Sequence, residues 1–148
     1  MHNIRLSTSK DMAAAVEIWR RAVDATHAFL TPEDRAAIDA EVSAFFPQTT
    51  LHLAVDQNDT PLALMYLDNG HMEALFVDPA CHGKGIGKSL IQAALVAAPN
   101  LTTDVNEQNL GALAFYEAIG FERTGRSECD GQGRPYPLIH LRYRSANG

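Results

Sequence analysis

Hydrophobic positions change along the chain between helical spacing and strand-like alternation. Thr8 and Asp11 have the spacing of a helix capping box. Thr31 and Pro32, followed by two acidic residues, are typical of a second helix start, and Pro47 would end that helix. The first helix is expected from residues that recur at steps of three or four. Four of them are hydrophobic and the last is a histidine: Met12, Val16, Trp19, Val23 and His27.

The rest of the pattern predicts strands and two further helices. Asn69-Gly70 is a tight-turn signal, and Gly120 is typical of the residue after a helix. Strands are expected near residue 5 and at 51–55, 62–67, 71–77, 101–105, 121–127 and 138–143, and helices at 86–97 and 109–120. This alternation predicts a mixed α/β fold in a single domain, residues 1–148.

A glycine-rich turn follows the strand expected at 71–77. Gly83, Gly85 and Gly87 alternate just before the helix expected at 86–97. Glycine adopts positive φ at little cost and lets backbone approach a ligand closely. Amides at the positive end of a helix dipole suit phosphate oxygens. We therefore interpret the segment as a diphosphate site, although glycines here could also serve turn geometry alone.

Three phosphate-binding patterns can be compared with this turn. The dinucleotide fingerprint G-x-G-x-x-G fails because its third glycine is missing. The P-loop pattern matches at residues 87–89 but needs a glycine where His82 stands. A third pattern, [QR]-x-x-G-x-[GA] after a strand ending in Val-Asp-Pro, fits Gly85, Gly87 and residues 77–79, with His82 replacing Gln or Arg.

A second pattern lies further along the chain. Within residues 106–121, the segment from Asn109 to Phe121 follows N-x-x-A-x-x-[FL]-Y-x-x-x-G-F. In this order and at this separation, the two patterns resemble motifs A and B of the GCN5-related N-acetyltransferases, the GNAT family. The resemblance covers almost the whole chain, and residues 26–30 match a Thr-His-x-Phe-Leu segment of small bacterial members.

The resemblance implies a fold and a reaction. The fold would be the acyl-CoA N-acyltransferase fold, a mostly antiparallel sheet with one splayed parallel strand pair, flanked by helices. Acetyl-coenzyme A would donate its acetyl group directly to a primary amine of a small molecule or peptide, without a covalent enzyme intermediate.

The same resemblance implies the residues that hold acetyl-coenzyme A. Asn106 would bond an amide of the pantetheine arm, although it could be a turn asparagine, and Asn109 is either a second contact or a helix cap. The arm would pair with the strand residues Leu75, Phe76 and Val77. The diphosphate would meet the backbone of His82, Gly83, Lys84, Gly85, Ile86, Gly87 and Lys88, and the two lysines could add charge or simply be solvated.

Catalysis needs a proton acceptor for the amine and a donor for the leaving thiolate. Tyr116 occupies the position of the family tyrosine beside the sulfur, and its alternative role is a core aromatic. Glu73 is the first candidate base, Asp104 the second, and a water relay the third. His71 could pass a proton but could equally be a surface residue. The backbone N–H near Val77 is the expected oxyanion donor.

Other polar residues have weaker interpretations. His27 would either line the acceptor site or be a core histidine bonded to a backbone carbonyl. Cys81 is expected to serve packing. The histidines lack metal-ligand spacing, so no metal is expected.

Composition limits the remaining functions. A net charge of −6 argues against a nucleic-acid partner. No apolar run reaches the length of a membrane span, the N-terminus lacks a signal-peptide core, and two cysteines form no disulfide framework, so a cytoplasmic protein is expected. The alternatives are a P-loop nucleotide hydrolase or kinase and a non-catalytic acyl-CoA sensor. The sequence leaves the acceptor and the oligomeric state open.

Overall fold

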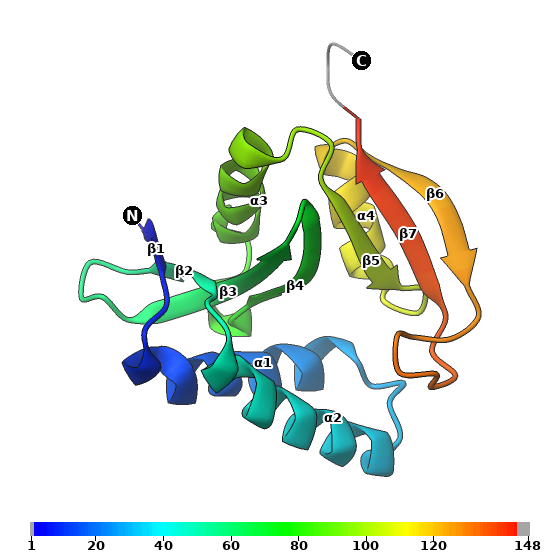
Figure 1. Cartoon of the computed structure of the whole chain (residues 1–148), viewed down its shortest axis with the longest axis horizontal. Coiled ribbons are helices and arrows are strands. Elements are labelled where there is room, and N and C mark those ends of the chain that lie inside the picture. Colours follow the sequence, from blue (N-terminus) through cyan, green and yellow to red (C-terminus); the bar gives the residue numbers. More distant parts are fainter. Residues whose placement is uncertain (1, 145–148) are drawn as a thin grey trace. The chain divides into compact units, whose positions relative to one another are not determined.

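The computed structural model of the chain describes residues 2–144, which form one seven-stranded sheet with four α-helices (Figure 1). The strands are β1 Asn3–Leu6, β2 His52–Val55, β3 Pro61–Asp68, β4 His71–Val77, β5 Thr102–Asn106, β6 Phe121–Ser127 and β7 Leu138–Tyr143. The helices are α1 Met12–Thr26, α2 Pro32–Phe45, α3 Ile86–Ala97 and α4 Leu110–Ile119, with short 3₁₀ turns at Ser9–Asp11, Phe46–Gln48 and Pro79–Cys81. The elements expected from the sequence are therefore confirmed.

The strand order is β1-β2-β3-β4-β5-β7-β6. The pairs β1–β2, β2–β3, β5–β7 and β6–β7 are antiparallel, whereas β4 and β5 pair in parallel. That parallel pairing joins His71 to Thr102 and Met72 to Thr103, at the start of both strands. A pairing limited to strand starts is what a splayed parallel pair requires, so the expected fold class is confirmed.

The chain divides into two compact units. The first unit is Met1–Leu67 with Ala74–Ile91, and the second is Asp68–Glu73 with Gln92–Gly148. Both β4 and α3 therefore contribute residues to each unit. The single domain expected over residues 1–148 stays a prediction.

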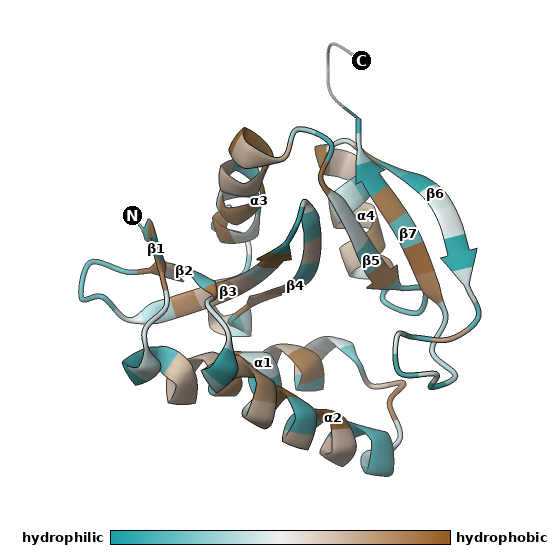
Figure 2. Ribbon diagram, in the orientation of Figure 1, coloured by the Kyte–Doolittle hydropathy of each residue, from teal (hydrophilic) through white to brown (hydrophobic). Residues whose placement is uncertain are grey.

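The first unit has its core between α1 and the strands β2 and β3. Ile18 and Trp19 of α1 are almost fully buried, and they belong to one cluster with Leu53 and Leu64. Figure 2 shows that hydrophobic residues dominate β3, as expected for a strand in a core. Burial of this helix face accounts for the spacing of hydrophobic residues in its sequence.

Helix α2 contacts α1 through charged groups, and its Ile38 and Val42 pack against the hydrophobic core. Thr31 caps its start by accepting a hydrogen bond from the Asp34 N–H at 3.1 Å, as the sequence predicts. The Asp39 carboxylate binds Arg20 of α1 and Arg35 of α2, each at 2.8 Å. These two arginines lower the pKa of Asp39 well below its usual range.

The second unit is built on β5, β7 and β6, with α4 beside them. The side chain of Asn109 caps α4 by accepting the Ala112 N–H at 3.2 Å. Gly120 ends the helix with φ +127°, and a Cβ there would lie 3.2 Å from the ring of Tyr143. The positive φ therefore favours glycine at this position, and a larger residue would also press on the tyrosine ring.

No helix among the described residues combines the length and the apolar character needed to cross a membrane.

Candidate active site

The glycine turn belongs to the first unit and connects the end of β4 to α3. Asp78 fixes its beginning: its N–H donates to the Leu62 carbonyl at 2.9 Å, and its carboxylate binds Arg21 at 2.7 Å. Gly83 and Gly85 have φ angles of +78° and +73°, and a Cβ at either would meet no heavy atom within 4 Å. The turn therefore needs glycine for its backbone conformation, while the space beside both residues is open.

Free amide groups are concentrated at the start of α3. Ser89 donates its N–H to the Gly85 carbonyl at 3.0 Å, which makes this the first i to i−4 bond of the helix. The amides of Ile86, Gly87 and Lys88 consequently have no acceptor inside the helix. The His82 N–H, in contrast, already donates to Pro79 at 3.3 Å within the preceding 3₁₀ turn.

This arrangement fits a diphosphate. The helix dipole places positive potential at the free amides, and the lysine side chains at positions 84 and 88 add cationic groups. Because the His82 amide is already bonded, the available donors begin after it.

The strand residues expected to pair with the pantetheine arm also lie in the first unit. Leu75, Phe76 and Val77 are half-buried, and the Phe76 side chain packs against the hydrophobic core. A ligand that paired with this segment as an added strand would bond its backbone N–H and C=O groups.

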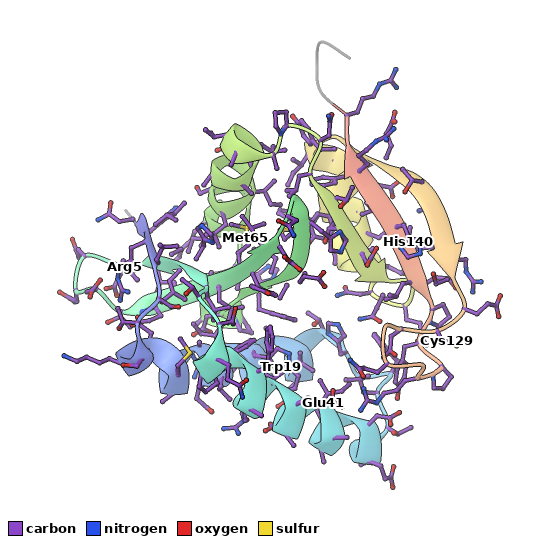
Figure 3. All side chains as sticks on the ribbon, in the orientation of Figure 1. Arg5, Trp19, Glu41, Met65, Cys129 and His140 are labelled. Carbon is purple, nitrogen blue, oxygen red and sulfur yellow. The ribbon has the colours of Figure 1, made fainter. Side chains whose placement is uncertain are left out.

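The second unit brings four titratable side chains of β4, β5 and β7 together. Asp104 lies directly opposite His140 in the β5–β7 register, and its Oδ1 is 2.6 Å from His140 Nδ1. Its other oxygen, Oδ2, is 3.3 Å from His71 Nε2. The same His71 nitrogen lies 3.9 Å from Oε1 of Glu73. Figure 3 labels His140 on β7.

Both candidate bases thus meet at one imidazole. His71 is anchored by Thr102, whose Oγ1 lies 2.7 Å from Nδ1. The sequence left His71 open between a relay and a surface residue, and the structure places it between Glu73 and Asp104. Both carboxylates remain partly exposed, so an amine in solvent can reach them.

Two further members of this group were missed by the sequence analysis. His140 is bonded to Asp104, and its Nε2 lies 2.6 Å from Oγ of Ser127 at the end of β6. Their positions follow from the pairing of β5 with β7 and of β7 with β6, which motif spacing does not specify.

Tyr116 and Asn106 occupy the second unit as well. Tyr116 is buried on α4, where its ring packs edge-on against Phe121 with centroids 5.4 Å apart. Burial raises the pKa of its phenol, which therefore stays protonated at neutral pH. Asn106 ends β5, and within residues 2–144 its side-chain amide makes no hydrogen bond, whereas the Asn109 amide oxygen is used as a helix cap.

His27 follows α1 in the first unit. Its ring is half-buried, lies 5.2 Å from Phe29, and has Nδ1 2.6 Å from the Thr26 hydroxyl. Burial lowers the pKa of this imidazole, which favours its neutral form. A role of His27 at the acceptor site stays a prediction.

The next feature is the set of side chains that could bind a metal ion or form a disulfide. Residues 2–144 contain no group of three histidine, cysteine, aspartate or glutamate side chains able to hold a metal ion. Cys81 and Cys129 are free thiols.

The sequence of this chain is similar to sequences of known proteins. The acetyltransferase (GNAT) domain family matches residues 20–136. The peptidyl-lysine N-acetyltransferase YjaB of Salmonella typhimurium is 50% identical over 143 residues, which cover 97% of this chain and 99% of that protein.

Two solved structures share the fold. The solution structure of apo-form YjaB from Escherichia coli superposes with a TM-score of 0.94 at 46% identity, covering 99% of both chains. PaiA N-acetyltransferase from Thermoplasma acidophilum, solved in complex with coenzyme A, has a TM-score of 0.78 at 17% identity, covering 97% of this chain and 99% of that one.

Proposed function

The chain belongs to the GNAT acetyltransferase family, and on that premise we propose that it transfers acetyl from acetyl-coenzyme A directly to the ε-amine of a lysine in a peptide. The observation that carries the proposal is the turn with positive-φ glycines and free amides at the start of α3. The name of the Salmonella relative supports a peptide lysine over a small-molecule amine.

We assign binding of the donor to residues 75–77, to residues 83–88 and to Asn106. The amides from Gly83 to Lys88 would hold the diphosphate, with charge added by Lys84. The backbone of Leu75, Phe76 and Val77 would pair with the pantetheine arm as an added strand does. Asn106, whose side-chain amide is free of other bonds among the described residues, would bind one amide of the arm.

Acetyl-coenzyme A supplies an activated thioester carbonyl for the amine to attack. The backbone N–H near Val77 would stabilise the developing oxyanion. Tyr116 would donate its phenolic proton to the leaving thiolate, and the raised pKa of this buried phenol keeps that proton in place until it is needed. No covalent enzyme intermediate is needed in this direct transfer.

The amine must lose a proton before it attacks. Glu73 is the first candidate base because it lies partly exposed on β4, next to the imidazole of His71. Asp104 is the second, and its bond to the same imidazole gives a transferred proton a path from one carboxylate to the other. A water relay remains the third route. His27 would line the acceptor site.

The testing experiment follows free coenzyme A thiol with a panel of lysine peptides and small amines. A blank without acceptor corrects for thioester hydrolysis, and mass spectrometry locates the acetyl group. Peptide acetylation on the lysine side chain supports the proposal. Acetylation of small amines alone would change the proposed acceptor from a peptide lysine to a small-molecule amine. Tight binding of acetyl-coenzyme A without turnover with any amine would make the protein an acyl-CoA sensor.

The remaining predictions concern partners and location. The P-loop alternative loses its support, because the family match includes the glycine turn on which it rested. We infer neither a nucleic-acid nor a membrane partner, given the net charge of −6, and we propose a cytoplasmic location.

A further inference from the structure

The second unit contains a serine, a histidine and an aspartate in one hydrogen-bonded line. Ser127 Oγ lies 2.6 Å from His140 Nε2, and His140 Nδ1 lies 2.6 Å from Asp104 Oδ1. Nothing in the acetyl transfer proposed above uses Ser127 or His140. A nucleophile within reach of a base that a third group orients is the recurring arrangement of nucleophilic catalysis.

With an ionised aspartate and a neutral histidine, the three groups have one consistent arrangement of protons. An ionised carboxylate can only accept hydrogen bonds, so His140 donates its Nδ1–H to Asp104. In the neutral imidazole, Nε2 is then the acceptor, and the Ser127 hydroxyl donates to it. This is the tautomer in which histidine can take a proton from a serine that attacks a carbonyl.

The aspartate is itself held in place. His71 approaches its second oxygen at 3.3 Å, and Thr102 anchors His71 from the other side at 2.7 Å. The group therefore rests on strands rather than on loops, which favours precise positioning. The side chains of His140 and Asp104 are 35% and 33% exposed, and Ser127 is half-buried, so a small acyl donor in solvent can reach the hydroxyl.

We propose that Ser127 is a nucleophile that takes an acyl group from an activated ester or thioester and passes it to water. Ser127 Oγ bonds to the acyl carbon while His140 Nε2 takes the hydroxyl proton. The bond from carbon to the leaving oxygen or sulfur then breaks, and the leaving group takes that proton. Water next attacks the acyl-serine with His140 as the base, releasing the carboxylic acid and restoring the Ser127 hydroxyl.

The test uses p-nitrophenyl acetate and the whole chain, without acetyl-coenzyme A or an amine. A burst approaching one p-nitrophenolate per chain is expected, followed by slow turnover, and peptide mapping should find the acetyl group on Ser127. Because Cys129 is an exposed thiol two residues away, the same burst is measured in Cys129→Ala, where it should persist.

Variants separate the three roles. Ser127→Ala should lose the burst, and His140→Gln and Asp104→Asn should slow acylation by about 10²–10⁴-fold, the range for a positioned base. Ser43→Ala is the matched control, because the Ser43 hydroxyl donates to the Asp39 carboxylate, at 3.3 Å, rather than to an imidazole. A burst retained in Ser127→Ala would overturn the proposal. So would a wild-type map without acetyl on Ser127, whatever the variants do.

Discussion

The Nδ1 atom of His140 lies 2.6 Å from Oδ1 of Asp104, directly across the antiparallel pair of β5 and β7. The other oxygen of Asp104, Oδ2, lies 3.3 Å from Nε2 of His71, so this carboxylate lies between two imidazoles. Each imidazole reaches a further side chain, Glu73 on one side and Ser127 on the other. A single carboxylate therefore connects the candidate base of acetyl transfer to the proposed nucleophile.

The first prediction ranks the two candidate bases. Glu73→Gln should lower kcat for acetyl transfer by about 10²–10⁴-fold, because the amide cannot accept the proton of the amine. Asp104→Asn should lower kcat less, since Asp104 reaches Glu73 only through His71. Steady-state kinetics on a peptide acceptor measures both. Glu122→Gln is the control, because Glu122 also lies on a strand of the second unit and its ion pair with Arg144 is exposed. A larger loss for Asp104→Asn would reverse the ranking.

The second prediction concerns the glycine turn. Gly85→Val should weaken acetyl-coenzyme A binding at least tenfold, because valine is strained at a φ of +73° and the turn must rearrange its amides. Calorimetry measures the affinity, and circular dichroism checks the fold. Gly131→Val is the matched control, since this loop glycine is equally open but does not have a positive φ. Unchanged affinity in a folded Gly85→Val protein would refute the placement of the diphosphate.

Local signals in the sequence were sufficient to predict the helices and the glycine-rich turn before α3. Thr31 is a predicted cap and accepts the expected amide hydrogen bond, and Asn109, for which a cap was one of two interpretations, accepts one as well. Each cap is decided within one helical turn of sequence, so its chemistry can be recognised without knowledge of the fold. The conformation of Gly85 follows for the same reason.

The cluster around Asp104 could not be predicted in the same way. His140 lies 36 residues further along the chain, and its position opposite Asp104 depends on the register of β7 against β5. A shift of one residue would turn the imidazole to the other face of the sheet. Ser127 depends in addition on the β6–β7 register, which contains an irregularity between Arg123 and Gly125.

The third prediction is a pH dependence of stability in the first unit. Arg5 holds Asp11 at 2.9 Å and lowers the pKa of this carboxyl to about 2. Because the folded-state pKa lies below the unfolded value, the stabilisation is complete above about pH 4 and is lost as the pH falls through 2. Asp11→Asn should cost about 1–2 kcal/mol at pH 7, after allowance for solvent screening.

Urea unfolding of wild type and Asp11→Asn measures this difference between pH 7 and the lowest pH at which both proteins fold. The difference in unfolding free energy should shrink as the pH drops below 4. Asp59→Asn is the control, because Asp59 also binds Arg5, at 2.8 Å, but its side chain is 70% exposed. A constant difference across the pH range would show that Arg5 does not stabilise the Asp11 carboxylate.

The last prediction assigns the Tyr116 hydroxyl to the leaving thiolate. Tyr116→Phe keeps the ring that packs against Phe121 and removes only the hydroxyl, so kcat should fall by about 10²–10⁴-fold. Acetyl-coenzyme A affinity should change much less, because the hydroxyl acts mainly in the transition state. Tyr143→Phe is a close control, since the Tyr143 ring packs edge-on against the same Phe121, with centroids 5.5 Å apart.

Because the pKa of the Tyr116 phenol is raised, the pH dependence of the rate is a second test of its role. A phenol whose folded-state pKa lies above its usual value keeps its proton to higher pH than an exposed tyrosine does. The rate of the wild type should therefore show no loss assignable to this group near pH 10, where an ordinary tyrosine ionises. Equal losses of rate and affinity in Tyr116→Phe would make Tyr116 a binding residue, and full activity would remove its hydroxyl from the mechanism.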